Sequence, residues 1–298
     1  MKKILVTGAS GFIGSYLVSK LSEDLNTKIY AIDRNQLTIK KKNILFINRD
    51  LKLMKKFPKV DIVFHLAAYN GTKHFYKNPS YVINDNIIPT LNLIDFYRKN
   101  PCKLFVYSGT SEIYSYKLIN KKKSYYGFSE KDPIIFKDLF NPRWSYAISK
   151  FMGEVSVINS KIPFIILRYF NIYGKGQKDH FIPEFIERLK KRVVSLYGYK
   201  NTRSFLFIDD AIKATLKIVN QKKSINEIFN IGSSKERSIL SVAKIILKLL
   251  KINKRIKLFN SPQGSIIRRR PNVKKVKKII GKIENIPLSV GLRKILNK

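Results

Sequence analysis

Tyr146 and Lys150 have the spacing of a catalytic pair on a helix. They stand at positions i and i+4 of an expected helix over about 145–159, so both side chains lie on one face, about a turn apart. A neighbouring ammonium favours the phenolate, which predicts a pKa for Tyr146 below the ordinary value of about 10. Such a tyrosine can accept a proton near neutral pH. Thr110, after an earlier strand, adds a hydroxyl that can hydrogen-bond a substrate oxygen being oxidised.

A second pattern, near the N-terminus, predicts a dinucleotide site. A short apolar strand at 3–7 is followed by Gly8, Gly11 and Gly14. We expect Gly8 to permit a tight turn, Gly11 to let backbone N–H groups approach a pyrophosphate, and Gly14 to let a helix pack closely. Asp33 ends a second apolar strand, where it can accept hydrogen bonds from a ribose diol. A glycine triplet or a Tyr-x-x-x-Lys spacing is weak evidence alone, so the prediction depends on their occurring together.

The elements that must position these residues alternate between apolar strands and helices, which is typical of a doubly wound parallel sheet. We expect an α/β fold with a Rossmann domain over 1–170, to which segments near 204–231 return. A smaller, partly interleaved α/β substrate domain covers 171–298. The expected strands lie at 3–7, 29–33, 44–47, 61–65, 103–107, 164–168, 193–197, 204–208 and 228–231. The expected helices lie near 79–100, 145–159, 182–191, from 209, and at 238–251. A polar loop over about 115–143 is long enough to indicate a lid or binding loop.

The bulk composition restricts the class of protein. The chain has 298 residues, one cysteine and no apolar run long enough to span a membrane, which favours a cytoplasmic protein. The net charge of +39 is compatible with a nucleic-acid partner or with a lysine-rich coding bias. We favour the bias, because the lysines are spread along the chain without the interleaved aromatic residues of a single-strand binder.

These motifs occur together in one known family. The chain resembles an extended short-chain dehydrogenase/reductase of the NAD-dependent nucleotide-sugar epimerase/dehydratase group, similar to UDP-glucose 4-epimerase. The matching motifs are GASGFIG at 8–14, Asp33, Asp50, HLAA at 65–68, Asn86 before Thr90, SGTSEIY at 108–114, YAISK at 146–150, RYFNIYG at 168–174, TRSFLFIDD at 202–210, NIGS at 230–233 and RRRPN at 268–272.

The resemblance implies a role for each matching position. Catalysis would involve Thr110, Glu112, Tyr146 and Lys150. NAD would be bound by Gly8, Gly11, Phe12, Ile13, Gly14, Asp33, Asp50, Leu51, Leu66, Ala67, Ala68, Tyr146 and Lys150. The nucleotide diphosphate of the substrate would be bound by Asn171, Arg203 and Arg269. His65 is expected to be a structural core residue, and no metal site is expected.

The resemblance implies that the substrate passes through a 4-keto intermediate. We expect 4-epimerisation of a nucleotide-diphosphate sugar, with decarboxylation or dehydration as alternatives within the family. Relatives that remove water usually carry Asp-Glu after the threonine, whereas this chain has Ser111-Glu112. A remote alternative is a non-enzymatic protein that binds RNA or senses redox state, which would not need the threonine, tyrosine and lysine.

Two further expectations concern the cofactor and the assembly. Asp33 would repel a 2′-phosphate and so favours NAD over NADP, although Arg34 directly after it could pair with one. The resemblance also implies a homodimer, in which the helices at about 79–100 and 145–159 pair with their copies in a four-helix bundle.

Overall fold

A computed structural model describes residues 1–114, 127–261 and 265–297. Its strands are β1 (Lys2–Thr7), β2 (Thr27–Asp33), β3 (Ile44–Asn48), β4 (Ile62–His65), β5 (Leu104–Thr110), β6 (Phe164–Tyr169), β7 (Ile172–Tyr173), β8 (Val194–Tyr197), β9 (Thr202–Ser204), β10 (Leu206–Phe207), β11 (Glu227–Ile231), β12 (Glu236–Ser238), β13 (Ile256–Phe259) and β14 (Arg268–Arg269). Its α-helices are α1 (Phe12–Leu21), α2 (Thr72–Lys77), α3 (Pro79–Lys99), α4 (Trp144–Ile158), α5 (Phe181–Arg188), α6 (Ile208–Val219), α7 (Ile239–Leu250), α8 (Lys274–Ile280) and α9 (Leu288–Leu296). Short 3₁₀ helices are η1 (Leu51–Leu53), η2 (Ser111–Ile113) and η3 (Lys222–Ser224).

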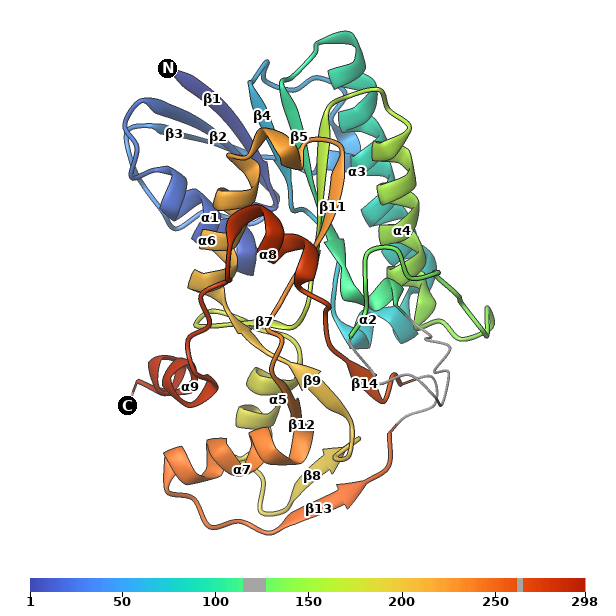
Figure 1. Cartoon of the computed structure of the whole chain (residues 1–298), viewed down its shortest axis with the longest axis vertical. Helices are drawn as coiled ribbons and strands as arrows, with labels where there is room; N and C mark the ends of the chain where they lie inside the picture. The colour runs from blue at the N-terminus through green and yellow to red at the C-terminus, as the bar shows by residue number, and fades with distance from the viewer. Residues whose placement is uncertain (115–126, 262–264, 298) are drawn as a thin grey trace. The chain divides into compact units, whose positions relative to one another are not determined.

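The largest sheet has seven strands in the order β11-β6-β5-β4-β1-β2-β3 (Figure 1). The pairs β1–β2, β1–β4, β2–β3 and β4–β5 are parallel. Every residue of β4, β5 and β6 is buried, as expected for strands covered by helices on both faces. Figure 1 shows α3 and α4 running alongside each other. The predicted doubly wound α/β fold is confirmed.

The strand order reverses at β1, and this reversal places the ligand site. The chain leaves the sheet at the β3 edge and returns at β4, on the other side of β1. Ligands of such folds bind outside the carboxyl ends of the strands at this point. The segments that follow β1 and β4, Gly8–Gly14 and Leu66–Ala68, are therefore brought together from distant parts of the sequence. The core beneath them contains Leu5, Val63 and Phe105, all fully buried.

The chain forms two compact units. Unit 1 comprises Met1–Ile113, Pro142–Arg168 and Thr215–Phe229, and contains nearly all of the large sheet. Unit 2 comprises Tyr114–Asn141, Tyr169–Ala214 and Asn230–Lys298. Residues 115–126, part of the predicted binding loop, lie outside the described residues. Within the described ranges, no helix is both long and apolar enough to cross a bilayer.

Unit 2 contains small sheets that the sequence did not resolve. The single strand predicted near 204–208 is divided between two short strands: β9 pairs with β12 and β14, whereas β10 pairs with β7. The helix expected from 209 already begins at Ile208. Strands of two or three residues form because of their tertiary partners, and they are too short for a periodic pattern in the sequence to predict them.

Candidate active site

The glycine turn after β1 leaves no room for side chains. Gly8 has a left-handed φ of 68°, and a Cβ added there would lie 2.6 Å from the backbone nitrogen of Ala67. A Cβ on Gly14 would lie 2.0 Å from the carbonyl oxygen of Gly8. Helix α1 is preceded by Gly11, which has no side chain to cap the first turn. Its N–H groups can therefore bind an anion, and the turn fits the pyrophosphate of a dinucleotide.

Asp33 lies at the carboxyl end of β2, beside this turn. Its carboxylate accepts hydrogen bonds from the backbone nitrogens of Ser10, at 3.0 Å, and Asn35, at 2.8 Å. The two bonds hold the carboxylate while leaving acceptor capacity on its oxygens, which fits a ribose diol. Asp50 accepts from the backbone nitrogen of Lys52 at 2.9 Å and caps η1, so it fixes the position of the buried Leu51.

His65 bridges the glycine turn and α3 in a buried chain of hydrogen bonds. Its Nδ1 lies 2.7 Å from Thr7 Oγ1, and its Nε2 lies 2.9 Å from Thr90 Oγ1. Thr90 Oγ1 donates to the Asn86 carbonyl at 2.8 Å, so it accepts from the Nε2–H of a neutral His65. Thr7 then donates to Nδ1 and accepts the Ala67 N–H at 3.4 Å. Burial, followed by the charge of Lys150, holds the pKa of His65 well below its usual value, so this residue is structural.

Asn86 connects the segment after β4 to the helix that carries the tyrosine. Its Oδ1 accepts from the Tyr69 backbone nitrogen at 2.7 Å, and its Nδ2 donates to Ser149 Oγ at 3.0 Å. Ser149 in turn donates to the carbonyl of Tyr146 at 2.8 Å. The sequence identified Asn86 as part of a motif, but this tie between α3 and α4 required the structure.

Tyr146 and Thr110 meet where β5 ends against α4. The Thr110 hydroxyl lies close enough to the Tyr146 hydroxyl to favour its phenolate form, and the Tyr146 ring stacks on Phe75 with centroids 5.1 Å apart. The predicted lowering of the Tyr146 pKa is wrong for this structure. Burial raises the pKa above its ordinary value, Thr110 opposes that shift, and the Glu112 carboxylate adds to it. Phe75, which helps to bury the ring, comes from the distant helix α2, and no spacing in the sequence linked it to Tyr146.

Lys150 is buried one turn further along α4. Its Nζ lies 3.4 Å from Ser108 Oγ and 4.1 Å from the centre of the Tyr107 ring. Burial lowers the pKa of Lys150 to about 7, although the Glu154 carboxylate opposes this shift. Lys150 therefore changes its charge near neutral pH.

Glu154 and Arg168 form a buried ion pair beneath this centre. The Arg168 Nη2 donates to Glu154 Oε2 at 2.7 Å, and Nε donates to both carboxylate oxygens at 3.2 and 3.1 Å. The Glu154 side chain is only 1% exposed, and that of Arg168 is 4% exposed. The pair holds α4 to β6. Arg168 begins the matching motif at 168–174, but the sequence did not predict its pairing with Glu154.

Glu112 also lies at this centre, on η2. Its backbone nitrogen donates to Thr110 Oγ1 at 3.2 Å, and its carboxylate faces the guanidinium of Arg143 at 3.6 Å. The structure thus brings together all four predicted catalytic residues, which come from β5, η2 and α4. Arg143 was not predicted, since its position three residues before Tyr146 carries no recognisable spacing.

The three residues predicted to bind the nucleotide diphosphate belong to unit 2. Arg203 and Arg269 are register partners on the neighbouring strands β9 and β14. Asn171 has a left-handed φ of 37°, and its buried Nδ2 has no hydrogen-bond partner among the described residues. A buried donor of this kind is costly unless a ligand accepts its hydrogen bond.

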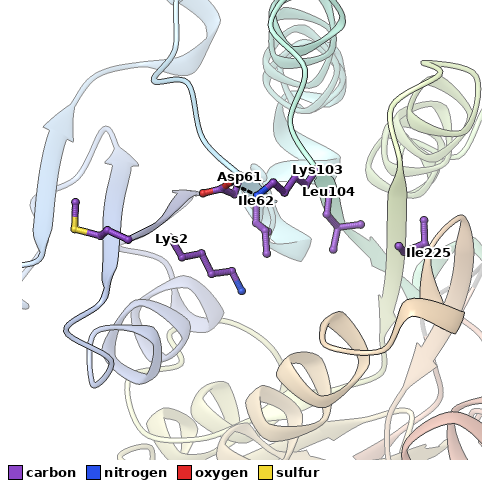
Figure 2. Close-up of a pocket in the computed structure, with 7 residues that line it drawn as sticks. Lys2, Asp61, Ile62, Lys103, Leu104 and Ile225 are labelled. Carbon is purple, nitrogen blue, oxygen red and sulfur yellow. Dashed lines mark ion pairs between the residues drawn. The ribbon is translucent and has the colours of Figure 1, made fainter.

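A hollow at the amino ends of the central strands is not the candidate site. The hollow has a volume of about 500 Å³. Figure 2 shows Lys2, Ile62 and Leu104 among the residues that line it. These residues begin β1, β4 and β5, so the hollow lies at their amino ends, whereas ligands of parallel α/β sheets bind at the carboxyl ends. The ion pair drawn there joins Lys103 to Asp61 at 2.9 Å.

Comparisons with known proteins agree with this geometry. Residues 4–232 match the model of the NAD dependent epimerase/dehydratase family. A putative UDP-glucose 4-epimerase of Methanocaldococcus jannaschii is 32% identical over 99% of this chain and 97% of its own length. A UDP-N-acetyl-alpha-D-glucosaminuronate decarboxylase of Bacillus cytotoxicus is 31% identical over the same shares, 99% and 97%. The crystal structure of a UDP-glucuronic acid 4-epimerase from Bacillus cereus, in complex with UDP-glucuronic acid and NAD, has a TM-score of 0.87 at 27% identity, covering 99% of this chain and 98% of that one. The chain therefore belongs to the NAD-dependent epimerase/dehydratase family of nucleotide-sugar enzymes, and its cofactor is NAD.

Proposed function

We propose that the protein interconverts C4 epimers of a nucleotide-diphosphate sugar through a transient 4-keto intermediate. The observation that carries this proposal is the proximity of the Thr110 and Tyr146 hydroxyls, with Tyr146 one helical turn before the buried Lys150. Two hydroxyls at one point can bind a single alcohol oxygen of a substrate and accept its proton. The similarity to a putative UDP-glucose 4-epimerase along 99% of the chain supports the choice of reaction.

In this mechanism the protein moves one proton and orients one oxygen. Tyr146 first loses its own proton to solvent, and the proton of the C4 hydroxyl then passes to the phenolate Oη of Tyr146, while Thr110 holds the same substrate oxygen by a hydrogen bond. The charged form of Lys150 favours the phenolate of Tyr146. Bound NAD supplies the hydride acceptor and donor. Return of the proton from Tyr146 to the C4 oxygen completes the cycle, and the product is the epimer if the sugar has turned its other face.

We assign the ligand contacts as follows. The pyrophosphate of NAD would be bound by the glycine turn and by the segment after β4. The residues are Gly8, Gly11, Phe12, Ile13 and Gly14 in the turn, and Leu66, Ala67 and Ala68 after β4. Asp33 would bind its adenosine ribose, Asp50 and Leu51 its adenine, and Tyr146 and Lys150 its nicotinamide ribose. Asn171, Arg203 and Arg269 would bind the diphosphate of the substrate, because guanidinium groups suit that geometry.

The test is incubation with a panel of UDP-, dTDP-, GDP- and CDP-sugars, followed by mass spectrometry and NMR of the product. The proposal expects an unchanged mass and inverted stereochemistry at C4. A product that has lost water would show that the reaction is dehydration, and a product that has lost carbon dioxide would show that it is decarboxylation. A panel in which no sugar is converted by protein that retains its NAD would contradict the proposal.

Decarboxylation of a hexuronate is the second candidate, and one contact favours it. Arg143 faces Glu112 at 3.6 Å beside the hydroxyl pair, and a guanidinium there can bind the carboxylate of an acidic sugar. The 31% identical relative is a decarboxylase, which is consistent with this reading. Release of carbon dioxide from a UDP-hexuronate would distinguish the two reactions.

We also propose that the protein is a homodimer through α3 and α4. These helices lie side by side and carry exposed apolar side chains: Tyr81, Ile88, Leu91, Met152, Val155 and Ile158. Pairing with a second copy would remove these side chains from water and would brace the helix that carries Tyr146 and Lys150. Sedimentation at micromolar concentration tests the proposal, and a monomer as the only species would contradict it.

A further inference from the structure

Arg34 and Lys52 share one carboxylate beside the carboxyl end of β2. The Arg34 Nη1 lies 3.0 Å from Asp85 Oδ2, and the Lys52 Nζ lies 2.5 Å from Asp85 Oδ1. The Asp85 side chain is 5% exposed, whereas that of Arg34 is 42% exposed. A buried aspartate on α3 therefore anchors a half-exposed arginine that directly follows Asp33.

Two tyrosine rings complete the cluster. The Arg34 guanidinium lies 5.3 Å from the centre of the Tyr69 ring, and the Lys52 ammonium lies 4.6 Å from that of Tyr81. The rings meet edge to face, with centroids 5.2 Å apart. Since cations bind the faces of aromatic rings, each cation is held by a ring as well as by Asp85. The cluster thus fixes the direction in which the Arg34 side chain extends.

This arrangement resolves an ambiguity at the ribose site. Asp33 fits the free diol of NAD, but an arginine beside it can bind the 2′-phosphate of NADP with its planar fork of N–H donors. If the guanidinium of Arg34 were available, the pair Asp33-Arg34 could accept either cofactor. In the structure it is bound to a carboxylate 51 positions away in the sequence.

We propose that Asp85 is a specificity-determining residue, which excludes NADP by holding the Arg34 guanidinium away from the 2′-phosphate position. Asp85 contacts neither reacting atoms nor the sugar in this scheme, so the inference does not depend on which nucleotide-sugar reaction the enzyme catalyses. Its effect is on the relative affinity for the two dinucleotides.

The test compares NAD and NADP binding to wild type and Asp85→Asn. Dissociation constants are measured by calorimetry, and the cofactor that copurifies is identified by mass spectrometry of denatured protein. Asp85→Asn should lower the ratio of the NADP to the NAD dissociation constant about tenfold or more, since one charge-assisted hydrogen bond to a phosphate is worth at least that. Asp95→Asn removes an exposed carboxylate from the same helix and should leave the ratio unchanged.

A double variant identifies the group responsible. Adding Arg34→Ala to Asp85→Asn should restore the wild-type ratio, because the released guanidinium is then absent. An unchanged ratio in folded Asp85→Asn would overturn the proposal, as would a gain for NADP that persists in the double variant.

If Asp85→Asn does not fold, Arg34→Ala alone can still refute the proposal. The proposal expects Arg34→Ala to have the same ratio of NADP to NAD dissociation constants as wild type, since the Arg34 guanidinium of wild type is bound to Asp85. A selective loss of NADP affinity in Arg34→Ala would show that Arg34 reaches the phosphate in wild type and would refute the role of Asp85.

Discussion

The glycine turn after β1 and the centre beside α4 perform their tasks by different means. In the turn, backbone geometry is decisive: Gly8 and Gly14 approach other backbone atoms so closely that a single added carbon would collide. At α4 the side chains are decisive, because Lys150 and Tyr146 lie buried with pKa values displaced by their surroundings. The turn therefore requires residues without a side chain beside neighbouring backbone, whereas the catalytic centre depends on the side chains that bury it. Substitutions at each region test this difference.

The largest effect should come from Tyr146→Phe. Phenylalanine can keep the stacking on Phe75 but lacks the oxygen that accepts the substrate proton. Turnover should fall by roughly 10²–10⁴-fold, with the loss in kcat more than in binding. Steady-state kinetics on the identified sugar and a thermal melt provide the measurement. A variant that kept most of its turnover would show that Tyr146 is not the proton acceptor.

Glu154→Gln should destabilise the protein by about 3 kcal/mol, because it leaves the buried Arg168 without its carboxylate. Glu187→Gln is the control, since Glu187 and Lys190 form an exposed pair with side chains 68% and 75% exposed. We expect that control to change stability by less than about 0.5 kcal/mol. Urea unfolding of both variants tests the comparison, and equal losses would mean that burial of the Glu154–Arg168 pair has no influence on stability.

Gly8→Ala should cost about 2–4 kcal/mol of unfolding free energy and weaken NAD binding. Gly176→Ala is the control that separates backbone strain from steric collision. Gly176 also has a left-handed φ, of 85°, but a Cβ there would meet no atom within 4 Å. Its cost should be only about 1 kcal/mol, from strain alone. If both alanines cost the same, the close approach of Gly8 to Ala67 is not what requires glycine.

Much of the fold could be predicted from local patterns. The helices expected at 79–100 and 145–159 occur as α3 and α4, with ends displaced by one residue at most. The last fifty residues were harder, because α8, α9, β13 and β14 lie among lysines and arginines that obscure any apolar period. Helix α9 is held by tertiary contact: a Cβ on Gly291 would lie 2.2 Å from the Tyr173 hydroxyl.

The site shows a different limit. Sequence motifs named Thr110, Tyr146 and Lys150, and the structure brings them together. The spacing between Tyr146 and Lys150 could not predict whether the pKa of Tyr146 is raised or lowered. The spacing reveals a neighbouring charge, but it does not reveal how deeply the tyrosine is buried. Tyr146 is buried by elements distant in the sequence, such as the Phe75 ring of α2, and this burial raises its pKa more than the nearby Thr110 hydroxyl lowers it. The pairing of Glu154 with Arg168 was not predicted for the same reason.

The smallest expected effect concerns pH and Lys150. Burial lowers the pKa of Lys150 in the folded protein to about 7, whereas the unfolded chain has the ordinary value near 10.5. Between these values the unfolded chain binds more protons than the folded protein, so this group makes stability rise with pH. Below pH 7 both states are protonated, and the cost of the buried charge is constant. From pH 7 to pH 8, wild type should gain up to about 1.4 kcal/mol relative to Lys150→Met, which cannot titrate. Chemical unfolding of both proteins at each pH measures the difference. A wild-type curve parallel to that of Lys150→Met would mean that Lys150 keeps an ordinary pKa and that burial at α4 does not displace it.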